Sequence, residues 1–278
     1  MLIADSQVHV WSANTPERPW RPGTKPHRVV PLDTAQLLKE MDEAGVHRAA
    51  LVPSTLEYDR NDLALEASCQ HPDRFATMGR MDVEAPDARG SLAAWCKQPG
   101  MRGMRCSFKE KRWRPFFNEG QLDWLWAEAE KAGMPMMMNT HGMISEIVSI
   151  AQHYPDFTFA LDHLGLDSHK KDHDAFRGID DLVKLARFPN IMVKVSALST
   201  YTTDTYPFRL LHPYIRKVYD AFGPKRMFWG TDLSRLNCTY RQAITMWTEE
   251  IPWLSSEDKE WIMGRALCAW LKWPIKGD

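Results

Sequence analysis

The sequence of 278 residues lacks the usual signals of membrane, secreted and nucleic-acid-binding proteins. It has no apolar run of about 18 residues, the length that a transmembrane helix needs, and no signal peptide at its start. The formal net charge is −1, and no segment rich in Lys or Arg stands out. These absences argue against a nucleic acid or an anionic membrane surface as partner. We therefore expect a soluble, cytoplasmic protein.

Cysteine is also scarce, with five residues scattered along the chain and no CxxC pair. This pattern predicts neither a zinc ribbon nor a disulfide framework, and reduced thiols in the core are expected instead. Hydrophobic residues make up 44% of the chain, enough for a large core. The twelve tryptophans indicate, besides core packing, a pocket with aromatic walls.

Short apolar segments alternate with amphipathic segments along the whole chain. The apolar segments, predicted to be strands, cover residues 2–11, 48–53, 75–81, 101–108, 134–139, 157–161, 191–198 and 227–229. The predicted helices cover residues 34–44, 61–70, 87–97, 121–132, 144–153, 179–187, 207–222, 241–249 and 256–271. Strict alternation of strand and helix predicts an α/β fold, a single (β/α)₈ TIM barrel with C-terminal helices, forming one domain over residues 1–278.

The first strand carries three polar residues, Asp5, Gln7 and His9, at alternate positions. Because side chains alternate along a strand, the spacing predicts that all three share one face. Gln7 and His9 lie near the end of the strand, where a parallel barrel has its active-site mouth. A buried hydrogen-bonded cluster without chemistry is the alternative interpretation.

Other polar residues stand at the ends of later strands. Arg105, His141, His163 and Asp232 fall at or near the ends of the fourth, fifth, sixth and eighth strands. In a barrel these ends converge on one mouth, so the residues are expected to meet His9 there. Imidazole and carboxylate groups serve both as ligands of divalent metals and as general acids and bases.

The chain resembles the amidohydrolase superfamily, in particular its amidohydrolase-2-like branch of sugar lactonases, pyrone dicarboxylate lactonase and metal-dependent decarboxylases. That family has H-x-H on strand one, His on strands five and six, and Asp on strand eight. The corresponding positions here read Gln7-Val8-His9, His141, His163 in LDHLG and Asp232 in WGTD. VKVSAL and IMGRAL are also similar to the branch. The resemblance covers nearly the whole chain.

Gln7 departs from the family pattern, since it stands in place of the first histidine. It offers a metal only a neutral amide oxygen, a poor ligand for zinc or manganese. Two interpretations remain open. One is a single divalent metal held by His9, His141 and Asp232, with Gln7 as ligand or orienting residue. The other is a site without metal. A binuclear site is not expected, because the fourth strand has no lysine to bridge two ions.

The resemblance implies catalytic roles for Asp232 and His163. Asp232 is expected to act as general base and acid, and its alternative role is the N-cap of a helix. His163 is expected to polarise the substrate carbonyl, while Asp162 beside it should point towards the helix layer. Arg105 is the candidate for binding a substrate carboxylate.

Further candidates line the expected pocket or the barrel interior. Gln7, Trp11 and Tyr201 are predicted to contact the substrate, with core packing as the alternative for the two aromatic residues. Lys194 should lie inside the barrel, where it needs a carboxylate or hydroxyl partner. The proline-rich segment 12–31 is a long loop that is expected to serve the site or cover it.

The leading hypothesis is a hydrolase of a small molecule, a lactonase that opens the ring ester of a small carboxylated or polyhydroxylated compound. A metal-dependent decarboxylase of an aromatic acid is the alternative reaction, and a barrel that only binds a ligand is the alternative without catalysis. The resemblance also permits a homo-oligomer.

Overall fold

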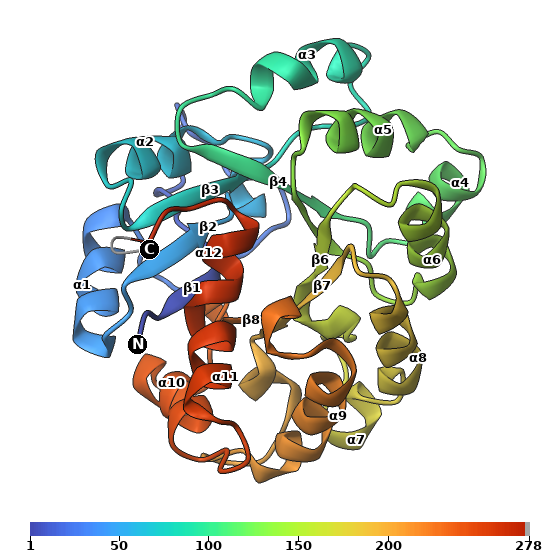
Figure 1. Cartoon of the computed structure of the whole chain (residues 1–278). Coiled ribbons are helices and arrows are strands. Elements are labelled where there is room, and N and C mark those ends of the chain that lie inside the picture. The colour runs from blue at the N-terminus through green and yellow to red at the C-terminus, as the bar shows by residue number, and fades with distance from the viewer. Residues whose placement is uncertain (276–278) are drawn as a thin grey trace.

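The computed structural model, which describes residues 1–275, contains one sheet of eight parallel strands in sequential order (Figure 1). The strands are β1 (Ala4–Val8), β2 (Arg48–Leu51), β3 (Phe75–Gly79), β4 (Met101–Ser107), β5 (Met136–Asn139), β6 (Phe159–Leu161), β7 (Ile191–Ser196) and β8 (Met227–Gly230). Each strand falls on one of the predicted apolar segments; seven are shorter than predicted, and β8 extends one residue further, to Gly230. The predicted TIM barrel is confirmed.

Helices follow the strands and lie around the outside of the sheet (Figure 1). They are α1 (Thr34–Ala44), α2 (Asp62–Gln70), α3 (Ala88–Trp95), α4 (Trp113–Asn118), α5 (Asp123–Ala132), α6 (Ile144–His153), α7 (Asp172–Ala175), α8 (Ile179–Lys184), α9 (His212–Phe222), α10 (Tyr240–Thr248), α11 (Ser256–Glu260) and α12 (Ala266–Trp270). The sequence did not predict α4 and α7. The predicted helix 256–271 comprises α11, a π-helical segment Trp261–Arg265 and α12.

Local signals explain the helix limits that were predicted best. Helix α1 begins after Asp33, whose side chain accepts a hydrogen bond from the Gln36 N–H, and it ends at Gly45 in the left-handed conformation with φ 82°. Its buried face carries Leu37 and Met41, four residues apart. By contrast, α9 begins at residue 212, five residues later than predicted.

The barrel closes where β8 returns beside β1. The backbone N–H of Asp232, just after β8, donates to the carbonyl of Gln7 at 3.0 Å. Gly230 makes this approach possible, because a Cβ there would lie 3.0 Å from Asp5 Oδ1 and 3.1 Å from the backbone nitrogen of Ser6. The closure therefore depends on a glycine at the last position of β8.

A β-bulge in β1 overturns the prediction that Asp5, Gln7 and His9 share one face. Asp5 pairs with Ala49 of β2, but Val8 pairs with Leu51, so β1 carries one extra residue between them. Asp5 consequently accepts a hydrogen bond from Tyr240 of the outer helix α10, whereas Gln7 contacts Lys194 inside the barrel. The bulge separates a structural aspartate from two residues of the mouth.

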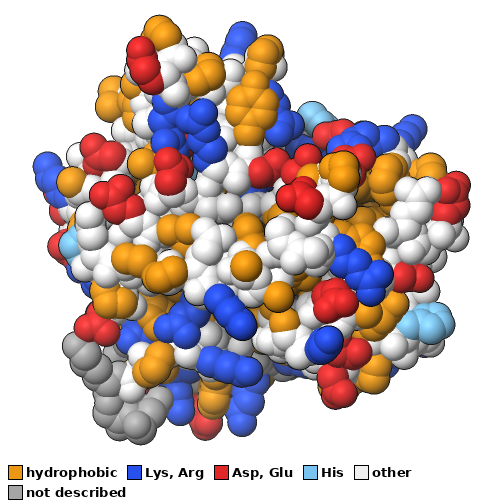
Figure 2. All heavy atoms as spheres, turned by 90° about the horizontal axis from the view of Figure 1, so that it is seen from above, with side chains coloured by type: hydrophobic (Ala, Val, Ile, Leu, Met, Phe, Trp, Pro, Cys, Tyr) orange, Lys and Arg blue, Asp and Glu red, His pale blue; other side chains and the backbone are white. Residues whose placement is uncertain are grey.

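The opposite end of the barrel is closed by apolar packing. Small inward residues such as Ala4, Ala50 and Ala76 form one buried cluster with Leu267 and Cys268 of α12. No helix within residues 1–275 is long and apolar enough to cross a membrane. On the face seen in Figure 2, Lys and Arg side chains are interspersed with Asp and Glu.

Candidate active site

The mouth of the barrel contains a cavity of about 650 Å³. Its floor is formed by residues at the carboxyl ends of the strands, among them Gln7, His9, Arg105, His163 and Asp232. This is the position of the active site in (β/α)₈ enzymes. The loop 12–31 contributes residues 21 and 24–27 to the cavity wall, so it adjoins the site as expected of a functional loop.

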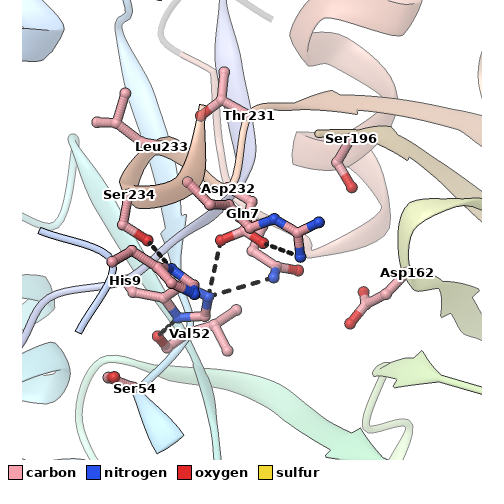
Figure 3. A network of polar contacts seen from close by, with 12 residues as sticks. Gln7, His9, Val52, Ser54, Asp162, Ser196, Thr231, Asp232, Leu233 and Ser234 are labelled. Atoms are coloured by element: carbon pink, nitrogen blue, oxygen red, sulfur yellow. Dashed lines mark hydrogen bonds and ion pairs between the residues drawn. The ribbon is translucent and has the colours of Figure 1, made fainter. Parts of the chain in front are cut away.

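Four side chains meet at the floor of the cavity, and Figure 3 shows three of them, Gln7, His9 and Asp232. Asp232 Oδ1 lies 3.1 Å from His9 Nε2, and Asp232 Oδ2 lies 3.6 Å from His163 Nε2. The amide nitrogen of Gln7 lies 3.5 Å from His9 Nε2 and 3.4 Å from His163 Nε2. The structure thus brings together four predicted site residues that are separated by up to 225 positions in the sequence.

Asp232 is a buried, ionised carboxylate. Burial favours its neutral form, but His9, His163 and Arg235 outweigh burial and hold the pKa of Asp232 well below its usual range. Its backbone is left-handed with φ 51°, and its side chain makes no capping hydrogen bond to the turn that follows. Oδ1 is buried and has no hydrogen bond of good geometry from any described residue. The side chain therefore faces the site as an acceptor rather than serving as a helix cap.

His163 is neutral at physiological pH. Burial lowers its pKa to about 4, although Asp232 and Asp162 oppose the shift. Its Nδ1 lies 2.8 Å from the Ser196 hydroxyl, which can either donate or accept. The Ser196 carbonyl lies 3.3 Å from the same nitrogen and can only accept, which favours a proton on Nδ1 and leaves Nε2 as an acceptor that faces the site.

His9 has its second nitrogen fixed. Nδ1 lies 2.7 Å from the carbonyl of Val52, which can only accept, so Nδ1 carries a proton (Figure 3). Nε2 faces the site and lies 3.1 Å from Asp232 Oδ1. The contact with Val52 therefore fixes the ring so that Nε2 faces Asp232 and the amide of Gln7.

A chain of buried polar contacts lies behind Gln7. Its amide oxygen accepts a hydrogen bond from Lys194, whose ammonium group also lies 2.8 Å from Asp162 Oδ1. The other oxygen of Asp162 accepts a hydrogen bond from Arg105 Nε at 3.0 Å. Burial lowers the pKa of Lys194 and Asp162 opposes this shift. For Asp162, burial favours the neutral form, but Lys194 and Arg105 outweigh it and lower the pKa to about 2.

These buried contacts correct the prediction made for Asp162 and agree with the one made for Lys194. Asp162 does not point towards the helix layer, because β6 ends at Leu161 and the alternation of faces ends with it. The following turn is left-handed at His163 and Leu164, which lets Asp162 face the barrel interior while His163 faces the mouth. Lys194 lies inside the barrel with a carboxylate partner, as expected.

Two predicted site residues, His141 and Tyr201, lie apart from the cluster at the floor of the cavity, whereas a third, Trp11, lines the cavity. His141 is 45% exposed, contacts the Gly165 carbonyl through Nδ1 at 3.1 Å, and does not line the cavity. It follows the end of β5 by two residues, beyond the point where the strand fixes side-chain direction. Tyr201 is buried behind Arg235, whose guanidinium lies over its ring. Trp11 lines the cavity.

Sequence reasoning missed two arginines of the cavity. Arg80 follows the end of β3 and lines the wall beside Arg105. Arg235 follows Asp232 by three residues, and its Nη1 lies 3.5 Å from Asp232 Oδ2. The rule that strand ends converge would have found Arg80. His27 of the loop 12–31 also lines the cavity, and its Nδ1 lies 3.0 Å from the Ser234 hydroxyl.

The side chains as arranged do not fit a divalent metal. No group of three or more His, Cys, Asp or Glu side chains in the described part of the chain is placed to hold one. His141, predicted as a ligand together with His9 and Asp232, lies outside the group. Gln7 turns an N–H₂ group, which cannot ligate a cation, towards both imidazoles. The donor set therefore differs from that of a metal centre.

The barrel, its cavity and the pairing of histidine with aspartate at the strand ends define a (β/α)₈ enzyme. A family model described as Amidohydrolase matches residues 4–266, and the chain belongs to the amidohydrolase family. It is a hydrolase of that family.

Known proteins similar to this chain agree with the assignment. L-Fucono-1,5-lactonase of Burkholderia ambifaria is 23% identical over 243 residues, covering 84% of this chain and 81% of that protein. An amidohydrolase of Burkholderia multivorans with bound zinc superposes with a TM-score of 0.83 at 20% identity, over 99% of this chain and all of that one. A probable 2-pyrone-4,6-dicarboxylic acid hydrolase of Acinetobacter baumannii with bound citric acid has a TM-score of 0.72 at 16% identity, over 98% and 100%.

Proposed function

We propose that the protein is a lactonase that opens the ring ester of a small carboxylated compound. The observation that carries the proposal is Asp232, an ionised and buried carboxylate whose Oδ1 lacks a good hydrogen bond at the floor of a cavity walled by arginines. Such an acceptor can take a proton from a water molecule beside it.

The reaction needs only the side chains at the floor. Asp232 removes a proton from water while the water oxygen forms a bond to the lactone carbonyl carbon. The developing oxyanion is stabilised by N–H donors of the floor, which include the amide of Gln7. The ring C–O bond then breaks, and the proton held by Asp232 passes to the leaving oxygen, directly or through His163. The product is an open-chain hydroxy acid, and Asp232 is ionised again.

Arg80 supports a substrate that carries a carboxylate. Its side chain is 13% exposed, and its Nε and Nη1 are buried without hydrogen-bond partners among the described residues. Asp59, 3.3 Å from Nε, is the nearest counter-charge. Burial lowers the pKa of Arg80, and the positive charge of Arg105 lowers it further. Two cations that face the same cavity and repel each other favour an anionic ligand.

The similar proteins support the same reaction class. One relative is named for hydrolysis of a sugar lactone, and one structural neighbour for hydrolysis of a pyrone dicarboxylic acid, with citric acid bound. Between these two substrate classes, Arg80 and Arg105 favour the carboxylated one for this chain.

The test is an assay of hydrolysis on a panel of lactones, in which the released acid is measured. Each carboxylated lactone is paired with its primary amide, which has the same ring but no charge. We expect the wild type to prefer the carboxylate, and Arg80→Met to lower kcat/KM for the carboxylate roughly 10–100-fold, the effect of losing one charge-assisted contact. For the amide, Arg80→Met should change kcat/KM less than threefold.

The matched control is Arg89→Met, which removes an exposed arginine 3.4 Å from Glu128 and away from the cavity. This variant should leave kcat/KM unchanged for both the carboxylate and the amide. Equal losses on carboxylate and amide in Arg80→Met would contradict the anion site, and no hydrolysis of any lactone would contradict the proposed reaction.

A further inference from the structure

The amide of Gln7 has one satisfactory orientation, and Lys194 determines it. Lys194 is fully buried, and its ammonium group has three donors and no acceptor. The Gln7 atom in front of it must therefore be the oxygen. If the amide were reversed, its N–H₂ would face the ammonium group, donor against donor, without water to separate them.

Lys194 is itself held in place. Asp162 Oδ1 lies 2.8 Å from Nζ, and the same carboxylate is fixed from the other side by Arg105. Lys194 and Asp162 are both completely buried. The lysine cannot turn away from Gln7 without leaving a buried carboxylate with one partner fewer.

The nitrogen of the same amide faces the site. It lies 3.5 Å from His9 Nε2 and 3.4 Å from His163 Nε2, beside the carboxylate of Asp232. A cation bound by these imidazoles would lie against the two amide hydrogens, which carry partial positive charge. The same hydrogens are well placed to donate to an oxygen that gains negative charge.

We propose that Lys194 is a positioning residue that locks Gln7 with its N–H₂ towards the mouth, so that this chain excludes a divalent metal and uses the amide as a hydrogen-bond donor instead. The donor role rests on the proposed lactonase function, whereas the exclusion of metal does not. The bulge in β1 completes the arrangement, because it turns Gln7 towards Lys194.

The decisive experiment measures zinc by plasma mass spectrometry after soaking in zinc chloride and removal of the excess. We expect less than about a tenth of an equivalent in the wild type and about one in Gln7→Glu, where one carboxylate oxygen stays on Lys194 and the other ligates beside His9, His163 and Asp232. Gln7→Met, which removes the amide without adding a ligand, should stay at the wild-type level.

Lys194→Met tests the lock itself. With no ammonium group in front of it, the amide can turn its oxygen to the imidazoles, and zinc uptake should rise at least fivefold over the wild type. Lys184→Met is the matched control, because Lys184 is exposed and pairs with Asp181 at 2.7 Å on the surface. A purely structural lysine would lower the thermal midpoint without any gain of zinc. The gain should also vanish in the double variant with Gln7→Met.

Three results would overturn the proposal. They are about one equivalent of zinc in the wild type, no more zinc in Gln7→Glu than in Gln7→Met, or a zinc gain in Lys194→Met that persists without Gln7. If Lys194→Met does not fold, the comparison of the two Gln7 variants decides alone. None of these measurements uses a substrate. The predicted zinc contents can therefore be observed even if no lactone is hydrolysed, and lactone hydrolysis can be observed even if the predicted zinc contents are not.

Discussion

Replacing Asp232 by Asn removes the proposed base and changes little in shape. The carboxylate faces His9 at 3.1 Å, Arg235 at 3.5 Å and His163 at 3.6 Å, and these neighbours keep it ionised. The amide cannot accept a proton from water, and general base catalysis contributes roughly 10²–10⁴-fold to a rate. We therefore expect Asp232→Asn to lower kcat for a lactone substrate by that factor.

The assay is acid release at about pH 7, where His163 is neutral because its pKa is about 4. Thermal unfolding is measured on the same samples, since the loss of a charge-assisted contact costs on the order of 2 kcal/mol of stability. Asp220→Asn is the control, because Asp220 is half-exposed and pairs with Arg216 at 2.7 Å. If Asp232→Asn kept kcat within threefold of the wild type, Asp232 would not be the base.

Two further predictions concern β1 and its neighbours. Burial raises the pKa of Asp5 from 3.8 to about 6 against its hydrogen bonds, so its contribution to stability is full below about pH 4 and is lost as pH rises through 6. Between about pH 5 and pH 7.5, chemical denaturation of the wild type should show about 1 kcal/mol more loss of stability than Asp5→Asn, and equal slopes would contradict this. Gly230→Ala should cost about 1–3 kcal/mol, because the new Cβ meets the backbone of Ser6, whereas Gly178→Ala, with no atom within 4 Å of its Cβ, should be neutral. A neutral Gly230→Ala in the same denaturation assay would contradict the closure described here.

The fold could be predicted because its signals are local. A buried strand in a parallel barrel is a short apolar run, and α1 is bounded by a capping aspartate and a left-handed glycine at its two ends. The helices that were missed, Trp113–Asn118 and Asp172–Ala175, have six and four residues. A segment of one turn or two carries too few positions to show a period of 3.6 residues.

The site could be predicted only as far as a strand fixes its last side chains. His9 stands one residue after β1, and Asp232 stands two residues after β8 with its backbone nitrogen bonded to β1. Both side chains lie, as predicted, in the cluster at the floor of the cavity. His141 also follows its strand by two residues, but it lies in an exposed turn that no neighbouring strand holds. The decisive difference is a long-range backbone contact, which spacing in the sequence does not reveal.

The bulge in β1 had the largest effect on the interpretation of the site. It makes successive polar residues of one strand serve different parts of the barrel: Asp5 bonds to Thr231 after β8, Gln7 to Lys194 on β7, and His9 to the carbonyl of Val52 after β2. A shift of β1 by one residue would break all of these contacts at once, so the register of β1 and the geometry of the floor are fixed together. This explains how a residue as weakly ligating as Gln7 can hold a central position. Its role follows from the lysine that the bulge makes it face, rather than from the metal ligand that the family places there.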